Sequence, residues 1–229
     1  MAPPNLNDLE QPSPLHGNDG RPIFITGIGT EIGKTVVSAI IVQALQADYW
    51  KPVQTGLADG TDNDRLKNLI TNTTTHFFDE VYKLKLPASP HIAAKEEDDN
   101  ISLDVIMQHY RTIQSGRLVI EGAGGLMVPL NDKDFVIDLI EQLQAKVILV
   151  SRNYLGSINH SLVTAALCKQ RKLDVVGWVF NDQFLHYEEE IAVWSGYPKI
   201  ASVPFSPQVN SIFVSEQAQL IKNALLKYL

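Results

Sequence analysis

The fold of this chain is decided by one stretch near its start, Ile23-Phe24-Ile25-Thr26-Gly27-Ile28-Gly29-Thr30-Glu31-Ile32-Gly33-Lys34-Thr35. Its first four residues are apolar or β-branched, which predicts a short buried strand. Apolar residues then recur at helical spacing and predict a helix; they are Val36, Val37, Ile40, Ile41, Ala44 and Leu45. A glycine-rich loop between a strand and a helix, closed by Gly-Lys-Thr, is the pattern of a phosphate-binding P-loop.

Each part of this loop has a chemical task. Glycines let backbone N–H groups curl around phosphate oxygens, and the helix start adds a favourable dipole. Lys34 is expected to reach the β- and γ-phosphates, and the Thr35 hydroxyl to bind Mg²⁺. The general pattern has glycine where this chain has Ile28, so the loop counted from Gly27 is one residue longer. A glycine-rich helix start without a phosphate is the alternative, but it does not explain Gly-Lys-Thr at the point where a helix begins.

The alternation of strand and helix continues along the chain. Strands are predicted over 49–53, 118–120, 147–150 and 175–180, and helices over 64–70, 157–169 and 188–194. The pattern predicts a single α/β domain of the P-loop type, with a mostly parallel central sheet and helices on both faces. Loops after the strand ends then share the sheet edge where ligands bind.

Two segments depart from this rhythm. The stretch 71–115 is interpreted as an insertion over the ligand edge. Residues 1–21 are rich in proline, glycine and polar side chains and are predicted to be a disordered tail, because they bury too little apolar surface to offset the entropy of ordering. The domain is therefore predicted to span 22–229.

Composition excludes several classes of function. A formal net charge of −7 leaves no positive field for a polyanion, so no nucleic-acid partner is expected. No stretch approaches the ~20 apolar residues of a membrane helix, and the start lacks a signal-peptide pattern, so a cytoplasmic protein without a membrane partner is expected. The single cysteine, Cys168, stands in an apolar stretch and is predicted to be a buried structural thiol.

A second lysine, Lys51, follows an apolar strand in the run Lys51-Pro52-Val53-Gln54-Thr55-Gly56. Taken alone it is a lysine whose stem covers apolar surface. On the ligand edge it would lie near Lys34, and two ammonium groups there would stabilise charge on a phosphoryl group in transfer. The turn at Thr55 offers a hydroxyl and N–H groups to a small substrate or a phosphate.

Phosphoryl transfer also needs carboxylates for its metal ion. Glu121 ends a predicted buried strand and is followed by Gly122-Ala123-Gly124-Gly125, which lets a ligand approach the backbone. An exposed turn glutamate is the alternative. Asp62 and Asp64 precede a predicted helix; either could serve the metal, and either could be a helix cap.

These segments, in this order, resemble the dethiobiotin synthetase family over roughly residues 22 to 206. The motifs that carry the resemblance are Gly27 to Thr35, Lys51 to Gly56, Ser89-Pro90-His91, Glu121 to Gly125, Gly156-Ser157-Ile158-Asn159-His160, Gly177-Trp178-Val179 and Asn181-Asp182. The longer P-loop is itself typical of that family. The resemblance implies a homodimeric, ATP- and Mg²⁺-dependent ligase that joins CO₂ to 7,8-diaminopelargonic acid through a carbamate and a mixed anhydride.

The resemblance also implies roles for individual residues. Thr35, Asp64 and Glu121 would bind Mg²⁺, with Lys34 and Lys51 as the catalytic lysines. The nucleotide would be held by Glu31, Ile32, Gly33, Lys34, Thr35, Val36, Asp64, Glu121, Gly122, Ala123, Gly124, Asn181, Asp182, Pro204, Phe205 and Ser206. The substrate would meet Thr55 and, across the dimer, Gly156, Ser157, Ile158 and Asn159, where a helix start suits a carboxylate.

Several features remain outside this assignment. His91 and His160 receive no catalytic role, because packing or helix-start hydrogen bonding explains each equally well. The segment from Asp182 to Glu190 is short for the family, and contacts with the substrate tail are not assigned there. The C-terminal stretch 217–229 is amphipathic, with a weak basic face, and is expected to dock on the sheet.

Other classes of protein share the P-loop. The strongest rival is an ATP-driven switch of the partition or septum-site type, which would carry a further lysine where this chain has Gly29. A related amidoligase acting on a larger acid would need a glutamine-hydrolysing domain, for which the chain has no room. A nucleotide-binding module without chemistry would not need Lys51 and the turn that follows it.

Overall fold

The computed structural model describes residues 20–182 and 184–229, and the predicted tail lies outside them except for Gly20 and Arg21. The strands are β1 (Ile23–Gly27), β2 (Asp48–Trp50), β3 (Val53–Thr55), β4 (Phe77–Phe78), β5 (Tyr82–Leu84), β6 (Leu118–Gly125), β7 (Lys146–Arg152), β8 (Asp174–Asn181) and β9 (Lys199–Val203). The helices are α1 (Lys34–Leu45), α2 (Asp62–Leu69), α3 (Pro90–Glu96), α4 (Leu103–Thr112), α5 (Val136–Gln142), α6 (Ser157–Gln170), α7 (Glu188–Ser195) and α8 (Ser211–Tyr228). A single 3₁₀ turn, Phe184–His186, precedes α7.

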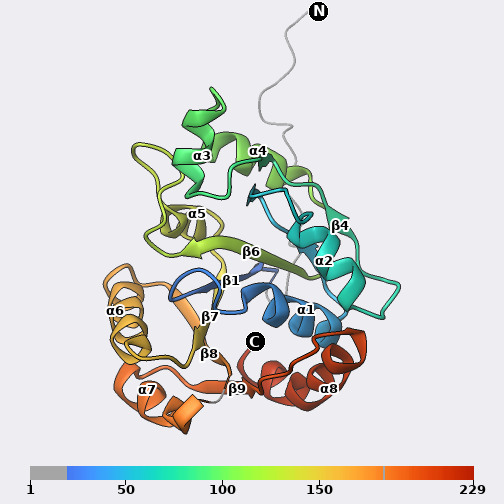
Figure 1. Cartoon of the computed structure of the whole chain (residues 1–229), viewed down its shortest axis with the longest axis vertical. Helices are drawn as coiled ribbons and strands as arrows, with labels where there is room; N and C mark the ends of the chain where they lie inside the picture. Colours follow the sequence, from blue (N-terminus) through green and yellow to red (C-terminus); the bar gives the residue numbers. More distant parts are fainter. Residues whose placement is uncertain (1–19, 183) are drawn as a thin grey trace, which may run out of the picture.

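Seven of the strands form one sheet in the order β4-β2-β6-β1-β7-β8-β9, and Figure 1 labels β4, β6, β1, β7, β8 and β9 of this sheet. β3 and β5 form a second, small sheet. Every neighbouring pair runs parallel. β1 lies at the centre, with Phe24 opposite Ile120 of β6 and Val147 of β7. The predicted fold class, one α/β domain around a mostly parallel sheet, is confirmed.

Helices cover both faces of the large sheet. Because side chains alternate along a strand, Ile23 and Ile25 of β1 join a core cluster with the inner faces of α1 and α8. Phe24 points the other way, into a cluster with residues of α4, α5, α6 and α7. α1 and α8 lie side by side on their face (Figure 1). The inward residues of α8 include Val214 and Leu225, so the predicted docking of the C-terminal stretch on the sheet is confirmed.

The strand predicted over 49–53 is two strands. β2 ends at Trp50, and β3 begins at Val53 in the small sheet. Between them Pro52 has no N–H for a ladder, which limits proline in strands. Its carbonyl instead accepts the N–H groups of Val81 and Tyr82. Pro52 therefore marks the place where the chain changes sheet.

The strand predicted over 118–120 is longer than expected, because β6 runs on to Gly125. Gly125 pairs with Gly27 of β1. A Cβ on Gly122 would lie 2.6 Å from the Phe24 ring, and one on Gly125 would lie 3.0 Å from the Gly27 carbonyl oxygen. The glycines interpreted as a turn therefore let β6 continue tightly along β1.

The segment 71–115 is part of the architecture as well as an insertion. It contributes the edge strand β4 and the partner strand β5, together with α3 and α4. Trp50 of β2 stacks with His109 and Tyr110 of α4, at centroid distances of 5.6 Å and 6.1 Å. In this part of the chain, as in the rest of the residues described, no helix is long and apolar enough to cross a membrane.

Candidate active site

The loop between β1 and α1 has the shape its sequence predicts. Gly33 adopts a left-handed conformation with φ +88°, which glycine accepts without strain. A side chain there would also collide with Asn181, because its Cβ would lie 1.9 Å from the amide nitrogen. The Lys34 ammonium donates to the Gly29 carbonyl at 2.7 Å, across the loop. The Lys34 side chain therefore spans the loop.

Next to this loop, three oxygen-bearing side chains converge. The Thr35 hydroxyl lies 3.0 Å from Asp62 Oδ1 and 2.9 Å from Glu121 Oε1. Thr35 is the second residue of α1, Asp62 begins α2, and Glu121 lies within β6. Parallel strands bring these chain positions to one edge of the sheet.

This donor set fits a magnesium ion. Mg²⁺ prefers hard oxygen ligands and is usually held by one or two carboxylates together with water and substrate phosphates. Within residues 20–182 and 184–229, no group of three or more histidine, cysteine or acidic side chains forms a metal cage. Two carboxylates and a hydroxyl beside a P-loop are what a nucleotide-bound magnesium ion requires.

Lys51 lies against both carboxylates. Its ammonium contacts Asp62 Oδ2 and lies 3.3 Å from Glu121 Oε1. Lys51 is 6% exposed and Glu121 is 1% exposed, so these charges meet away from bulk water. A buried ammonium held by two carboxylates is a fixed positive charge. Lys51 therefore does more than cover apolar surface with its stem.

The environment shifts the ionisation of these groups in different directions. Burial lowers the pKa of Lys34 to about 8, although Glu121 opposes the shift. Burial also disfavours the charged form of Lys51, but Glu121 and Asp62 outweigh it and raise the pKa of Lys51. Burial would raise the pKa of Asp62, yet Lys51 and the Thr35 hydroxyl hold that pKa below its ordinary value. The neighbouring carboxylates therefore favour the charged form of Lys51, whereas burial lowers the pKa of Lys34.

Asp64, which the resemblance assigns to the metal, is hydrogen-bonded at the start of its own helix. Asp64 Oδ2 accepts the N–H and the hydroxyl of Thr61, while its own N–H donates to the Thr61 hydroxyl. This reciprocal arrangement is a capping box at the start of α2. Asp62, two residues earlier, points to Thr35 instead. The two alternatives left open by the sequence are thus separated: Asp64 caps the helix and Asp62 faces the loop.

Two further side chains support the carboxylates and were not expected from the sequence. The Tyr49 hydroxyl donates to Glu121 Oε2 at 2.8 Å, and Gln54 Oε1 accepts the N–H of Asp62 at 3.1 Å. Burial, reinforced by Glu121, raises the pKa of Tyr49 well above its ordinary value, so its hydroxyl keeps the proton it donates. The only sequence signal for Tyr49 is its place two residues before Lys51.

Five residues predicted to hold the nucleotide, Asn181, Asp182 and those of the segment 204–206, follow or end β8 and β9. The Asn181 amide, at the end of β8, donates to the Ile32 carbonyl at 3.0 Å. Asp182 follows with φ +69°, and its carboxylate lies 3.5 Å from Arg152. The segment 204–206 follows β9, and Phe205 is 69% exposed. β8 and β9 end at the same edge of the sheet as β1, and the Asp182 N–H donates to the Val203 carbonyl at 2.9 Å, so the two segments begin beside each other.

The residues predicted to meet the substrate lie in two places. Thr55 ends β3, beside the left-handed Gly56. Gly156, with φ +103°, precedes α6, whose first residue Ser157 is hydrogen-bonded to the Tyr187 hydroxyl at 2.7 Å. Ile158 and Asn159 follow in the first turn of α6. Among the described residues, no hydrogen bond joins Asn159 to Lys51 at the candidate active site.

The two histidines make local hydrogen bonds. His91 Nδ1 lies 3.1 Å from the Ser89 hydroxyl, just before α3. His160 Nδ1 lies 2.7 Å from the Tyr154 hydroxyl. Each contact stays within six positions of the chain, which fits the interpretation of both as residues of local structure.

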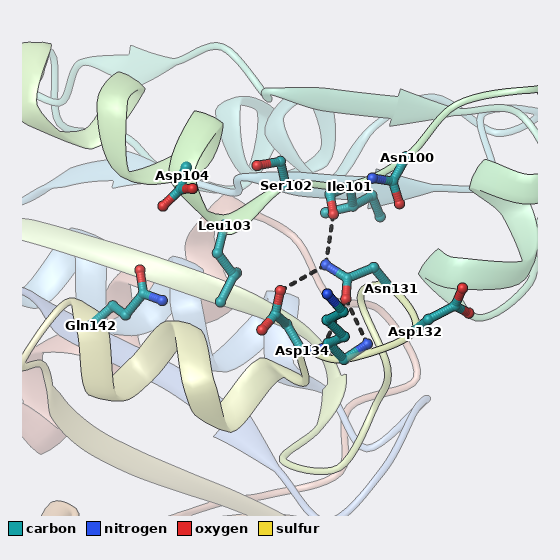
Figure 2. A pocket seen from close by; sticks show the side chains of 10 residues that line it. Asn100, Ile101, Ser102, Leu103, Asp104, Asn131, Asp132, Asp134 and Gln142 are labelled. Carbon is teal, nitrogen blue, oxygen red and sulfur yellow. Dashed lines mark hydrogen bonds between the residues drawn. The ribbon is translucent and has the colours of Figure 1, made fainter.

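A cavity of about 430 Å³ lies elsewhere, between the start of α4 and the loop that precedes α5 (Figure 2). Asn131 spans it, donating to the Ile101 carbonyl and to Asp134, each at 2.8 Å. None of its lining residues belongs to the predicted site. The converging Thr35, Asp62, Glu121 and Lys51 therefore remain the candidate active site.

Comparison with known proteins covers most of the chain. A family model described as an AAA domain matches residues 21–212. The ATP-dependent dethiobiotin synthetase of Christiangramia forsetii is 44% identical over 203 residues, covering 88% of this chain and 96% of that protein. The protein of the same name from Cytophaga hutchinsonii is 45% identical, covering 85% of this chain and 94% of that protein.

Among solved structures, the ParA family ATPase from Chlorobium tepidum TLS has a similar fold, with a TM-score of 0.57. The two sequences are 13% identical, and the match covers 94% of this chain and 98% of that one. At such an identity the likeness shows the fold alone. The partition-type rival therefore shares the architecture of this chain, whereas the synthetases share its sequence.

Proposed function

Because the chain belongs to the ATP-dependent dethiobiotin synthetase family, we propose that it closes the ureido ring of dethiobiotin from 7,8-diaminopelargonic acid and CO₂. The reaction is a step of biotin biosynthesis, forms C–N bonds and converts ATP to ADP and phosphate. The observation that carries the proposal is the buried Lys51 ammonium between Asp62 and Glu121, directly beside the P-loop. A nucleotide-binding module without chemistry would have no use for a cation in that position.

The nucleotide and the metal ion are assigned to residues of this chain. The P-loop from Glu31 to Val36 would hold the phosphates, with Lys34 at the β- and γ-phosphates. Thr35, Asp62 and Glu121 would hold Mg²⁺, which would neutralise charge on the phosphate oxygens. The base would lie between Asn181-Asp182 and the segment 204–206.

The chemistry proceeds in three steps. One substrate amine adds to CO₂ and loses a proton, giving a carbamate. A carbamate oxygen attacks the γ-phosphorus and ADP leaves, which produces a carbamic-phosphoric mixed anhydride. The second amine then attacks the carbonyl carbon, loses a proton and expels phosphate, which closes the ring. No side chain needs to act as a nucleophile, so positioning and electrostatics carry the catalysis.

Lys51 is assigned the central electrostatic task. Its raised pKa keeps it protonated, so it is suited to stabilise the negative carbamate and the phosphoryl group in transfer, and unsuited to act as a base. Thr55 is assigned to the substrate. The start of α6, from Gly156 to Asn159, is assigned to the substrate carboxylate of a second chain, in a homodimer.

The product assay tests the proposal directly. ADP and phosphate should appear only when the diamine and bicarbonate are both present, and mass spectrometry should identify dethiobiotin as the product. ATP hydrolysis at the same rate without the diamine would contradict the synthetase assignment and favour the switch class.

Replacement of the central lysine tests the mechanism. Lys51→Gln should lower the rate of ring closure by roughly 10²-fold or more, because a fixed charge near the transferring group is removed. The dissociation constant for ATP, measured by calorimetry, should change little, since Lys34 and the loop backbone hold the phosphates. Lys95→Gln is the matched control, because Lys95 pairs with Asp132 on the surface. A fully active Lys51→Gln enzyme would remove this residue from the mechanism.

A further inference from the structure

Tyr49 contacts one oxygen of the Glu121 carboxylate, and Thr35 and Lys51 contact the other. The Tyr49 hydroxyl lies 2.8 Å from Oε2, whereas Oε1 lies 2.9 Å from the Thr35 hydroxyl and 3.3 Å from the Lys51 ammonium. Tyr49 is 0% exposed and Glu121 is 1% exposed. No bulk water competes for the tyrosine bond, so it is a fixed feature of the site.

The geometry of β2 explains how Tyr49 reaches this carboxylate. Side chains alternate along a strand, so Tyr49 leaves β2 on the face opposite to Trp50, and Lys51, directly after the strand, reaches the same carboxylate as Tyr49. Trp50 between them enters the opposite core cluster. The Tyr49 ring packs edge-on against Phe77, with centroids 6.0 Å apart. Tyr49 in β2 and Lys51, the residue directly after it, thus bring two donors to the two oxygens of Glu121.

This bond restricts how Glu121 can meet a cation. The terminal torsion of a glutamate is broad, so a carboxylate without a partner can rotate or offer both oxygens at once. Mg²⁺ requires near-ideal octahedral geometry, whereas Ca²⁺ accepts carboxylates that bind through both oxygens. With Oε2 already bonded to a hydroxyl, Glu121 presents Oε1 alone toward Thr35.

We propose that Tyr49 is a positioning residue, which holds Glu121 so that a single oxygen faces the divalent cation and thereby favours Mg²⁺ over Ca²⁺. This inference rests on the metal role proposed above for Glu121. The sequence pattern gave Tyr49 no role beyond its place in a strand.

The test is a calorimetric titration of Mg²⁺ into the full chain saturated with ADP. Tyr49→Phe keeps the ring and removes the hydroxyl, so Mg²⁺ affinity should fall roughly tenfold, as it does when a partner of a metal ligand is lost. Ca²⁺ affinity should fall less, and ADP affinity without metal should stay the same. In the ring-closure assay the Mg²⁺ concentration for half-activation should rise, while the rate at saturating Mg²⁺ recovers.

Two controls separate this role from a structural one. Tyr82→Phe removes another buried tyrosine hydroxyl, which accepts the Ser102 N–H at 3.0 Å and does not contact Glu121; it should leave Mg²⁺ affinity unchanged. In a Glu121→Gln background, Tyr49→Phe should have no further effect on Mg²⁺ affinity. If the phenylalanine variant does not fold, Tyr49→Met removes the same hydroxyl with a side chain that adapts to the space.

An unchanged Mg²⁺ affinity in Tyr49→Phe, or an equal loss in the Glu121→Gln background, would overturn the inference. Failure of the proposed function is a separate result, because the titration needs neither diamine nor bicarbonate. A chain that makes no dethiobiotin but loses Mg²⁺ affinity with Tyr49→Phe would refute the function and keep the inference. A chain that makes dethiobiotin but binds Mg²⁺ equally well after Tyr49→Phe would keep the function and refute the inference.

Discussion

Asp62 and Asp64 stand on the same first turn of α2 but meet different partners. Asp62 approaches Thr35 and Lys51, whereas Asp64 completes a capping box with Thr61. A carboxylate bonded to the backbone of its own helix has little freedom to bind a metal. The direction of each side chain, and not its chemical type, therefore decides which aspartate belongs to the site.

Paired substitutions measure this difference. Asp62→Asn should weaken Mg²⁺ binding by roughly tenfold or more, because a charged oxygen beside Thr35 is lost. Asp64→Asn should leave Mg²⁺ binding unchanged and destabilise only the start of α2. The Mg²⁺ dependence of ring closure in each variant is the measurement. A larger effect from Asp64→Asn would restore it as the metal ligand.

Cys168 gives a prediction about pH. Burial raises the pKa of its thiol from 9.0 to about 12 in the folded chain. Between these values the unfolded state releases a proton that the folded state keeps, so the contribution of the thiol to stability is full below pH 9 and falls as pH rises. The stability of the parent relative to Cys168→Ala should drop by about 1 kcal/mol from pH 9 to pH 10.

Urea unfolding of both proteins at the two pH values provides the measurement. The folded chain should also resist thiol reagents at pH 8 and react once it is unfolded. Rapid labelling of the native chain would show that Cys168 is accessible and that its thiol is not held neutral by burial.

For individual residues, the sequence predicts the features that depend on neighbouring positions in the chain. Lys34 and Thr35 follow from one loop, and Lys51 and Glu121 follow from their places at strand ends. Tyr49 does not, because its partner Glu121 lies 72 positions away and the bond depends on how two strands pair. The choice between Asp62 and Asp64 likewise depends on the orientation of α2, which the sequence leaves open.

The helices α8 and α4 differ in whether a side chain accepts a hydrogen bond from a backbone N–H of the first turn. The Asn210 side chain accepts the Phe213 N–H at 3.0 Å and caps α8. Ser102, at the same position before α4, makes no such bond. Asn210→Ala should therefore lower the free energy of unfolding by about 1 kcal/mol, and Ser102→Ala by less.

Urea denaturation of the two variants tests this contrast. Ring closure well below the melting temperature should be unaffected in both, because neither residue lies at the candidate active site. Equal losses of stability would mean that the Asn210 bond contributes nothing to α8 beyond what solvent provides.

The boundaries of the elements show where sequence patterns fail. α6 and α7 begin where apolar spacing places them. The strand predicted over 49–53 divides at Pro52, and β6 continues through glycines that usually end a strand. In both cases a contact with a distant strand decides the outcome. The Pro52 carbonyl accepts the N–H of Tyr82 in β5, and Gly125 pairs with Gly27 in β1.

For the whole molecule, the fold class follows from the alternation of strands and helices, but the order of the strands does not. The order β4-β2-β6-β1-β7-β8-β9 depends on how the crossovers are arranged in space. The edge strand β4 comes from the segment 71–115, whose polar composition gave no sign of it. The predicted contribution of a second chain to the substrate site is likewise a property of the whole assembly.

The surface offers a test of the proposed homodimer. Leu155, beside the predicted substrate segment at the start of α6, is 100% exposed. If this face meets a second chain, Leu155→Asp should convert the dimer to a monomer in sedimentation experiments and lower ring closure. Leu220→Asp, on the exposed face of α8, is the control and should change neither. A dimer unaffected by Leu155→Asp would place the interface elsewhere.

The central place of β1 has a consequence for how the protein opens. β1 is bonded on both sides, to β6 and β7, and both its faces are covered by core clusters. In native-state hydrogen exchange its amides should be among the slowest in the molecule, while those of the short edge strand β4 exchange early. The strand that carries the phosphate loop then opens only with global unfolding, so the sheet can fray at its margin while the nucleotide remains bound.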